Sequence, residues 1–188
     1  KDRLYTSAPK SLARRSAQTA LHQITHALLR WMAPFLSFTA EEAWKIVGHS
    51  ESIFLEKFTD LPAGDEALLA KWQRLREIRD VVNKDIEDVR TTGAVGASLQ
   101  AEVTLTAEPE DLALLQSLGD DLKFVFITSA AQAIAGEALA TSVQASEHAK
   151  CERCWHYRDD VGVNPAHPTI CGRCDSNLHG EGEVRTKA

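Results

Sequence analysis

Hydrophobic side chains in the first part of the chain recur with the spacing of an amphipathic helix. The large apolar positions of this stretch, with one alanine, are Leu12, Ala17, Leu21, Ile24, Leu28 and Trp31. Steps of three to five residues place them on one helical face, so the pattern predicts a long helix from Lys10 to Ala33 that Pro34 ends or kinks. The opposite side carries a basic row at steps of four, with Arg15 beside it: Arg14, Gln18, His22, His26 and Arg30. Such a row is typical of a solvated face, but its positive charge leaves phosphate binding open.

A second, shorter helix is expected directly afterwards. Thr39 and Glu42 have the spacing of a capping box, which predicts a helix from Ala40 to Val47 ended by Gly48. Trp44 should face inward on this helix, and residues 52–58 should form an extended connector.

A third helix is predicted between Asp65, as its N-cap, and Gly93. Its apolar residues form a heptad-like seam that is broken at Arg79: Leu68, Trp72, Leu75, Val82, Ile86 and Val89. Long helices joined by short links favour an antiparallel helical bundle.

The hydrophobic period changes from helix to strand after Gly93. Alternating apolar residues from Leu99 to Ala107 predict a half-buried strand, and Pro109 suits the first turn of a helix that reaches Leu118. Residues 124–127 are a candidate buried strand and residues 140–146 a weaker one, so this stretch is expected to be a small α/β unit.

All four cysteines lie in the next segment, as two pairs with sixteen residues between them: Cys151, Cys154, Cys171 and Cys174. Two such knuckles facing each other surround one ion with four sulfurs, which predicts a single structural Zn²⁺. Two disulfides would need an oxidising compartment, and no secretory signal opens the chain. A redox motif is usually a single pair, and an all-cysteine shell leaves no open position for a catalytic water.

The residues around the cysteines fit a structural role and nucleic-acid binding equally well. Arg153 and Arg173 each precede the second cysteine of a pair, where they offset the negative charge of four thiolates on one divalent ion. Trp155, His156 and Tyr157 follow the first pair directly and resemble a stacking platform for an unpaired base, although aromatic residues beside zinc knuckles are often core residues.

Charge is distributed unevenly over the 188 residues, whose net charge is −6. Residues 1–50 have seven Lys and Arg against three Asp and Glu, residues 51–147 have eight against eighteen, and residues 148–188 have six of each. A polyanion would therefore meet the basic first part and the cysteine segment rather than the acidic middle. No apolar run approaches the roughly 20 residues of a membrane span, so no membrane partner is expected and the location is interpreted as cytoplasmic. Phosphate-loop, dinucleotide-binding and hydrolase-elbow motifs are absent, and no catalytic constellation is found.

Several stretches together resemble the C-terminal part of bacterial isoleucyl-tRNA synthetase, a class I aminoacyl-tRNA synthetase. They are DRLYT near the start, ARRSAQTAL at residues 13–21, RWMAPFLSFTAEEAW at residues 30–44, and CERCWHY, ICGRC and GEGEVR near the end. The helical stretches also occur loosely in the valyl and leucyl enzymes, whereas the paired cysteine module points to isoleucine. The likeness spans nearly the whole chain.

The resemblance implies that this chain is the part of the synthetase that binds tRNA(Ile), while a catalytic domain that binds ATP and an editing domain lie elsewhere in the full-length enzyme. Neither of the family's catalytic signatures, HIGH and KMSKS, occurs here, so the piece alone should be inactive. The resemblance also implies that Trp155 stacks on tRNA, and that the first helices of the bundle are missing. With the basic residues added, the candidate tRNA contacts are Trp155, Arg153, Arg173, Arg14, Arg15 and Arg30.

The predicted fold is therefore α+β with three domains: an antiparallel anticodon-binding helical bundle at residues 1–92, a small α/β junction unit at residues 93–147, and a four-cysteine zinc-knuckle module at residues 148–188. Two other functions remain open at this point. One is a free-standing zinc-ribbon adaptor that binds protein or RNA partners, and the other is a thiol enzyme that uses the paired cysteines.

Overall fold

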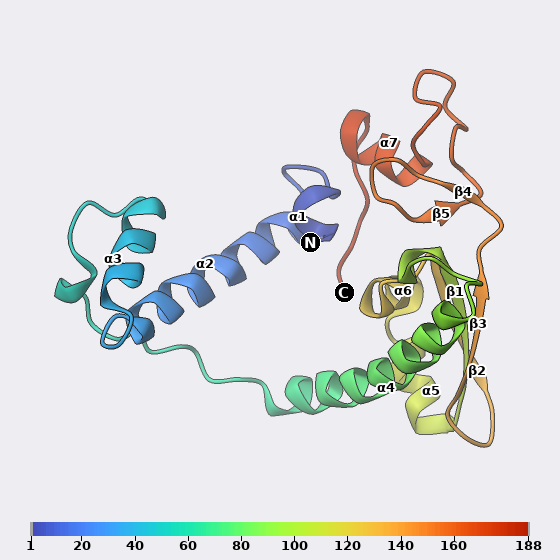
Figure 1. Ribbon diagram of the computed structural model, residues 1–188, viewed down its shortest axis with the longest axis horizontal. Helices are drawn as coiled ribbons and strands as arrows, with labels where there is room; N and C mark the ends of the chain where they lie inside the picture. The colour runs from blue at the N-terminus through green and yellow to red at the C-terminus, as the bar shows by residue number, and fades with distance from the viewer. Residues whose placement is uncertain (1, 188) are drawn as a thin grey trace.

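The structure, a computed structural model, describes residues 2–187 of the chain. Three parts follow one another: a helical arm (residues 12–55), a sheet unit (residues 66–145) and a cysteine module (residues 149–179) that lies beside the N-terminus (Figure 1). The α+β class and the four-cysteine cluster predicted from the sequence are confirmed.

The first long helix forms where its periodicity predicts it. After the short helix α1 (Asp2–Tyr5), α2 runs from Leu12 to Met32, and the hydroxyl of Ser11 caps it by accepting from the Arg14 amide at 3.3 Å. The helix ends just before Pro34, as expected. The face that it buries is narrower than the predicted apolar stripe and consists of Ala13, Ala27 and Leu29.

The second helix begins earlier than its apparent capping box. Helix α3 spans Ser37–Ile46, so Thr39 lies inside it and the predicted cap is wrong. The amide of Leu36 bonds to the Met32 carbonyl at 2.8 Å, and this tight turn after Pro34 starts the next helix without a side-chain cap. Trp44 is buried as predicted, and Gly48 follows the helix end with a φ of +105°.

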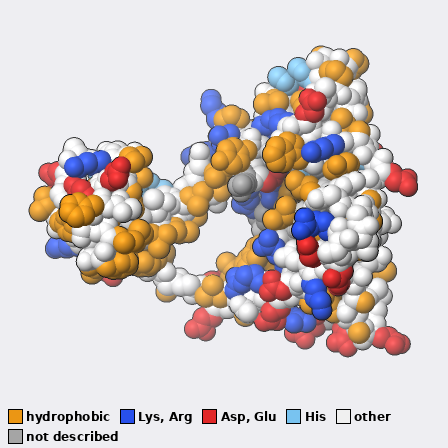
Figure 2. All heavy atoms as spheres, in the orientation of Figure 1, with side chains coloured by type: hydrophobic (Ala, Val, Ile, Leu, Met, Phe, Trp, Pro, Cys, Tyr) orange, Lys and Arg blue, Asp and Glu red, His pale blue; other side chains and the backbone are white. Residues whose placement is uncertain are grey.

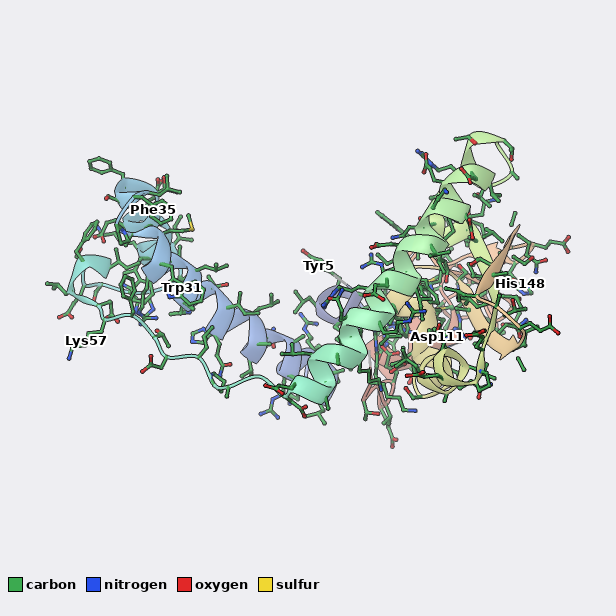
Figure 3. All side chains as sticks on the ribbon, turned by 90° about the horizontal axis from the view of Figure 1, so that it is seen from below. Tyr5, Trp31, Phe35, Lys57, Asp111 and His148 are labelled. Carbon is green, nitrogen blue, oxygen red and sulfur yellow. The ribbon has the colours of Figure 1, made fainter. Side chains whose placement is uncertain are left out.

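The segment after α3 is not simply extended. A 3₁₀ turn, η1 (Ile53–Leu55), forms because the Ser52 hydroxyl caps it and Ile53 packs against the α3 core. Large apolar side chains remain exposed around this end of the arm, where Figure 2 shows hydrophobic atoms gathered. Trp31 and Phe35 lie there, at the far end of α2 from Tyr5 (Figure 3).

The third helix packs on the sheet rather than along α2. Helix α4 (Glu66–Thr91) starts at Asp65, whose carboxylate accepts from the Leu68 amide at 3.0 Å, and ends before Gly93, both as predicted. Its buried residues are Leu75, Ile78, Val82 and Ile86, which join the core of the sheet unit. Ile78 fills the place where the seam appears broken at Arg79. Helix α4 therefore covers the apolar face of the sheet, and its position differs from that of a helix packed in a bundle with α2.

Three strands form a mixed sheet in the order β2-β1-β3. The central strand β1 (Ala101–Ala107) buries alternate residues as predicted, and η2 (Ser98–Gln100) precedes it. Strand β2 (Ala130–Ala135) pairs with it in parallel and β3 (Ala140–Ala145) antiparallel, so Val103 lies between Ala131 and Val143. The weak third strand is thus confirmed.

The predicted strand at residues 124–127 is wrong. After α5 (Pro109–Gln116) and η3 (Gly119–Asp121), this run forms α6 (Leu122–Phe126), with Phe126 fully buried, and Ile127 ends it in the left-handed conformation with a φ of 59°. The parallel pairing of β1 and β2 needs a crossover between them, and α5 and α6 supply it. The second strand is instead the alanine-rich β2.

The cysteine module contains little regular structure. A two-residue ladder joins β4 (Ala149–Lys150) to β5 (Tyr157–Arg158), and α7 (Gly172–His179) follows the second cysteine pair. The boundaries 92/93 and 147/148 stay predictions, although the packing of α4 joins residues 66–91 to the sheet that follows them.

Candidate metal centre and nucleic-acid interface

The four cysteines converge at one buried point. Their relative exposures are 0% for Cys151, 8% for Cys154, and 0% for Cys171 and Cys174, and their ligand atoms lie within 4.8 Å of one another. The sulfurs of Cys154 and Cys171 are 3.7 Å apart. Thiolates about 2.3 Å from a tetrahedral Zn²⁺ would be about 3.8 Å apart, whereas a disulfide bond is about 2.05 Å long. The cluster therefore fits a four-coordinate zinc ion and not two disulfides.

Local backbone bonds build this cluster. The Cys151 amide donates to the His156 carbonyl at 2.9 Å and the Trp155 amide to the Cys151 carbonyl at 2.9 Å, which closes the first knuckle into a tight turn. Cys171 precedes α7 as its N-cap, so Cys174 projects from the first helical turn. The Cys171 amide also donates to the Cys151 sulfur at 3.3 Å, a contact that favours a thiolate.

The thiols perturb one another because they are so close. Hydrogen bonds from Cys154 and Cys171 lower the pKa of Cys174 to about 4, and the hydrogen bond with Cys171 raises the pKa of Cys154. Burial of all four sulfurs also argues against the thiol-enzyme reading, because a reactive cysteine must be accessible to its substrate.

Trp155 stands out from the knuckle instead of packing beneath it. Its side chain is 59% exposed, and the Lys150 ammonium lies 5.5 Å from the ring centroid. The backbone of Trp155 has a φ of 67°, a left-handed conformation that costs an L-residue about 1 kcal/mol or more. Its neighbour His156 does not share the platform: it is 5% exposed and packs on Phe124, and burial together with the Arg173 charge lowers its pKa to about 4.

The two arginines of the knuckles bind other parts of the chain. Arg153 donates to the carbonyls of Thr6 at 2.8 Å and Tyr5 at 3.0 Å. Arg173 has a side chain only 8% exposed and pairs with Asp2 at 2.6 Å and Glu183 at 2.7 Å. Their role as tRNA contacts stays a prediction, but both guanidinium groups already have protein partners.

Arg173 belongs to a network of largely buried charges that no sequence pattern predicted. Asp2 also pairs with Arg185, whose guanidinium lies over the Phe124 ring at 3.6 Å from its centroid. Burial alone would raise the pKa of Asp2, but the hydrogen bonds and charge of Arg173, with smaller contributions from Thr6 and Arg185, outweigh it and lower that pKa to about 2. The partners are 171 and 183 residues apart along the chain, so no local pattern could indicate them.

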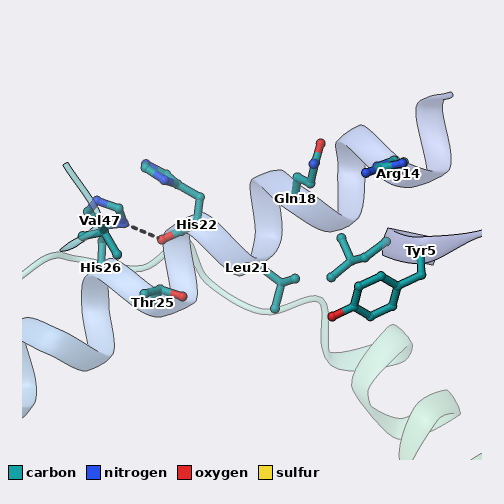
Figure 4. Close-up of a pocket in the computed structure, with 9 residues that line it drawn as sticks. Tyr5, Arg14, Gln18, Leu21, His22, Thr25, His26 and Val47 are labelled. Carbon is teal, nitrogen blue, oxygen red and sulfur yellow. Dashed lines mark hydrogen bonds between the residues drawn. The ribbon is translucent and has the colours of Figure 1, made fainter. Parts of the chain in front are cut away.

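Most of the basic row on α2 lines an open groove of about 460 Å³ between α1 and the end of α3. Arg14, Gln18, His22 and His26 lie along it in sequence, as Figure 4 shows. Arg15 is exposed beside this row. Arg30 differs from the other members, because it pairs with Glu56 at 2.8 Å and lies 4.7 Å over the Trp44 ring.

Comparison with known proteins finds two family matches, one that includes the helical arm and one within the cysteine module. Residues 1–105 match the family described as the anticodon-binding domain of tRNA ligase. The chain belongs to this family. Residues 150–177 match a zinc finger found in FPG and IleRS, so the family match and the buried cysteines together establish one structural zinc site.

Curated relatives with this similarity are named isoleucine–tRNA ligases. One from Cupriavidus pinatubonensis is 60% identical over 198 residues, and one from Thiobacillus denitrificans is 56% identical over 191 residues. Each match covers 100% of this chain but only 20% and 21% of the respective relative, so the chain spans about a fifth of their length. Within residues 2–187, no helix is long and apolar enough to cross a membrane.

Proposed function

We propose that this chain is the tRNA-gripping part of an isoleucine–tRNA ligase and that it recognises the anticodon stem-loop of tRNA(Ile). The anticodon-binding match over residues 1–105, the zinc-finger match and the names of the relatives support this. The rest of the ligase would bind ATP and isoleucine and perform the reaction, since the HIGH and KMSKS signatures are absent from this sequence. The cytoplasm, where protein synthesis needs charged tRNA, is the location that goes with this function.

The exposed ring of Trp155 carries the proposal. Its backbone belongs to a turn that the metal ligands Cys151 and Cys154 fix, so little conformational entropy is lost when a base stacks on it. The Lys150 ammonium beside the ring adds a positive charge where a phosphate would pass.

The groove along α2 continues the binding surface from Trp155 toward the place where we expect the anticodon stem. Arg153 ties the knuckle to residues 5 and 6, and Arg14 donates to the Ser7 carbonyl at 3.4 Å, so the groove begins close to the knuckle. Arg14 and Arg15 are therefore the arginines that we assign to phosphates. Arg173 and Arg30 support this surface from within, because carboxylates already neutralise them.

The proposal is tested by replacing Trp155 with Gly in the full-length ligase. Glycine favours the left-handed backbone at this position, so Trp155→Gly removes the ring without straining the knuckle. Stacking on an unpaired base is worth about 1–3 kcal/mol, so tRNA(Ile) should bind about tenfold more weakly or worse.

Trp155→Phe is the matched control, because it keeps a smaller aromatic face and should lose much less affinity. Zinc content must be the same in both variants and in the unchanged protein. Full tRNA affinity in a zinc-replete Trp155→Gly protein would exclude a stacking role.

A further inference from the structure

A second cluster of metal-ligand side chains lies on the cysteine module, apart from the four sulfurs. It consists of His167, Asp175 and His179, whose ligand atoms lie within 4.8 Å of one another. Asp175 and His179 are four residues apart on α7 and therefore share one helical face, while His167 comes from the long loop between the two knuckles.

The cluster combines two stacked imidazole rings with a shielded carboxylate oxygen. The two imidazole rings are stacked, with centroids 4.0 Å apart and planes 8° from parallel. The Nε2 atom of His167 is 3.8 Å from Oδ1 of Asp175, which is too far for a hydrogen bond. Within residues 2–187, that oxygen is shielded from solvent and accepts no hydrogen bond. A buried carboxylate oxygen without a donor is costly unless a cation neutralises it.

The other oxygen of Asp175 is held in place. Asn164 donates to Oδ2 at 3.0 Å, which orients the carboxylate and leaves Oδ1 on the side of His167. The amide of His167 donates to the Asn164 carbonyl at 2.9 Å, so the same residue also fixes the loop that carries His167.

We propose that His167, Asp175 and His179 bind a second divalent transition-metal ion that clips the inter-knuckle loop to α7. Two imidazoles and one carboxylate suit Zn²⁺, Ni²⁺ or Co²⁺, whereas Mg²⁺ and Ca²⁺ prefer all-oxygen shells. Ligand atoms on a tetrahedral zinc ion are about 3.4 Å apart, so binding requires the stacked rings to tilt. Both histidines can tilt, because His167 has a side chain 34% exposed and His179 is exposed.

This site should bind its metal ion more weakly than the cysteine site does. A closed and buried four-sulfur shell retains zinc against dialysis, whereas three ligands at the surface leave positions open to water and should exchange their metal at micromolar free concentration. The zinc-loaded chain should therefore take up a second, exchangeable equivalent.

The test is the zinc content of the 188-residue chain after equilibration with micromolar buffered free zinc. We expect two equivalents for the unchanged protein and one for the double variant His167→Ala with His179→Ala. His148→Ala is the matched control, since His148 directly precedes the cysteine module and belongs to neither cluster, and it should retain two. One equivalent in the unchanged protein, or two in the double variant, would overturn the proposal.

A second measurement needs no variant and so does not depend on the folding of one. Substoichiometric Ni²⁺, which is paramagnetic when octahedral, should broaden the NMR signals of the His167 and His179 rings before those of other histidines. Broadening centred first on His26 and His49, whose ring nitrogens are 2.8 Å apart on the helical arm, would contradict the proposed site. Uniform or absent broadening would contradict it as well.

Discussion

Replacing Asp2 with Asn should weaken the attachment of the N-terminal helix to the cysteine module. The Asp2 carboxylate pairs with Arg173 and Arg185, whose side chains are only 8% and 4% exposed, and accepts from the Thr6 hydroxyl at 2.8 Å. Asparagine keeps the shape of the side chain but removes its charge. Two largely buried guanidinium groups would then lose one carboxylate, while Arg173 would keep its pair with Glu183.

The magnitude follows from the pKa of Asp2. It is lowered from its ordinary value of 3.8 to about 2, and this difference corresponds to about 2 kcal/mol of stability. Because the folded-state pKa is the lower one, the contribution is fully present above pH 3.8 and is lost as the pH falls through about 2. Removing one partner of a buried pair usually costs about 3–5 kcal/mol. Since Glu183 still pairs with Arg173, we expect about 2–3 kcal/mol at neutral pH.

The assay is urea unfolding at pH 7, followed by zinc release to a coloured chelator and by tryptophan fluorescence. Neutral pH is needed because acid displaces zinc from its thiolates. Asp159→Asn is the matched control, since this residue is exposed on the same module and should leave the midpoint unchanged. A loss below about 0.5 kcal/mol for Asp2→Asn would refute the reasoning, because that is the value of an exposed ion pair.

Three further predictions concern the other parts of the chain. Cys154→Ser should release the zinc ion and unfold the cysteine module while most of the helical far-UV signal remains, and one tightly bound equivalent in this variant would contradict a four-cysteine site. Phe126→Ala should destabilise the sheet unit by about 3–5 kcal/mol without changing zinc content, because the ring is fully buried, and an unchanged unfolding midpoint would contradict that packing. Replacing Arg14 and Arg15 with Gln should weaken tRNA binding and reduce the slope of log affinity against log salt by roughly one to two units, whereas an unchanged slope would show that neither residue contacts phosphate.

Local signals predicted the helices and the metal site well. The caps and period of α4 lie within its own sequence, and the paired cysteines need only a turn and a loop to meet. The start of α3 was missed because backbone bonds around Pro34 replaced the side-chain cap that the spacing at Thr39 indicated.

The remaining elements and contacts could not be predicted, because short apolar runs are ambiguous and tertiary packing depends on residues distant in sequence. Four apolar residues at positions 124–127 fit a buried strand or a buried helical turn equally well, and only the crossover between β1 and β2 decides for the helix. Strand β2 is rich in alanine, which has little strand propensity, so its pattern gave no signal. The packing of α4 on the sheet and the pairing of Asp2 with Arg173 depend on contacts distant in sequence.

The preference of the full-length protein for one anticodon tests the central claim most directly. Its affinity should be measured for tRNA(Ile) and for a transcript that differs only in the anticodon, with Trp155 present and with Trp155→Gly. We predict that the changed anticodon weakens binding by about tenfold or more to the unchanged protein, and that Trp155→Gly removes a large part of this difference. Equal affinity of the unchanged, zinc-loaded protein for the two tRNAs would contradict anticodon recognition by this chain.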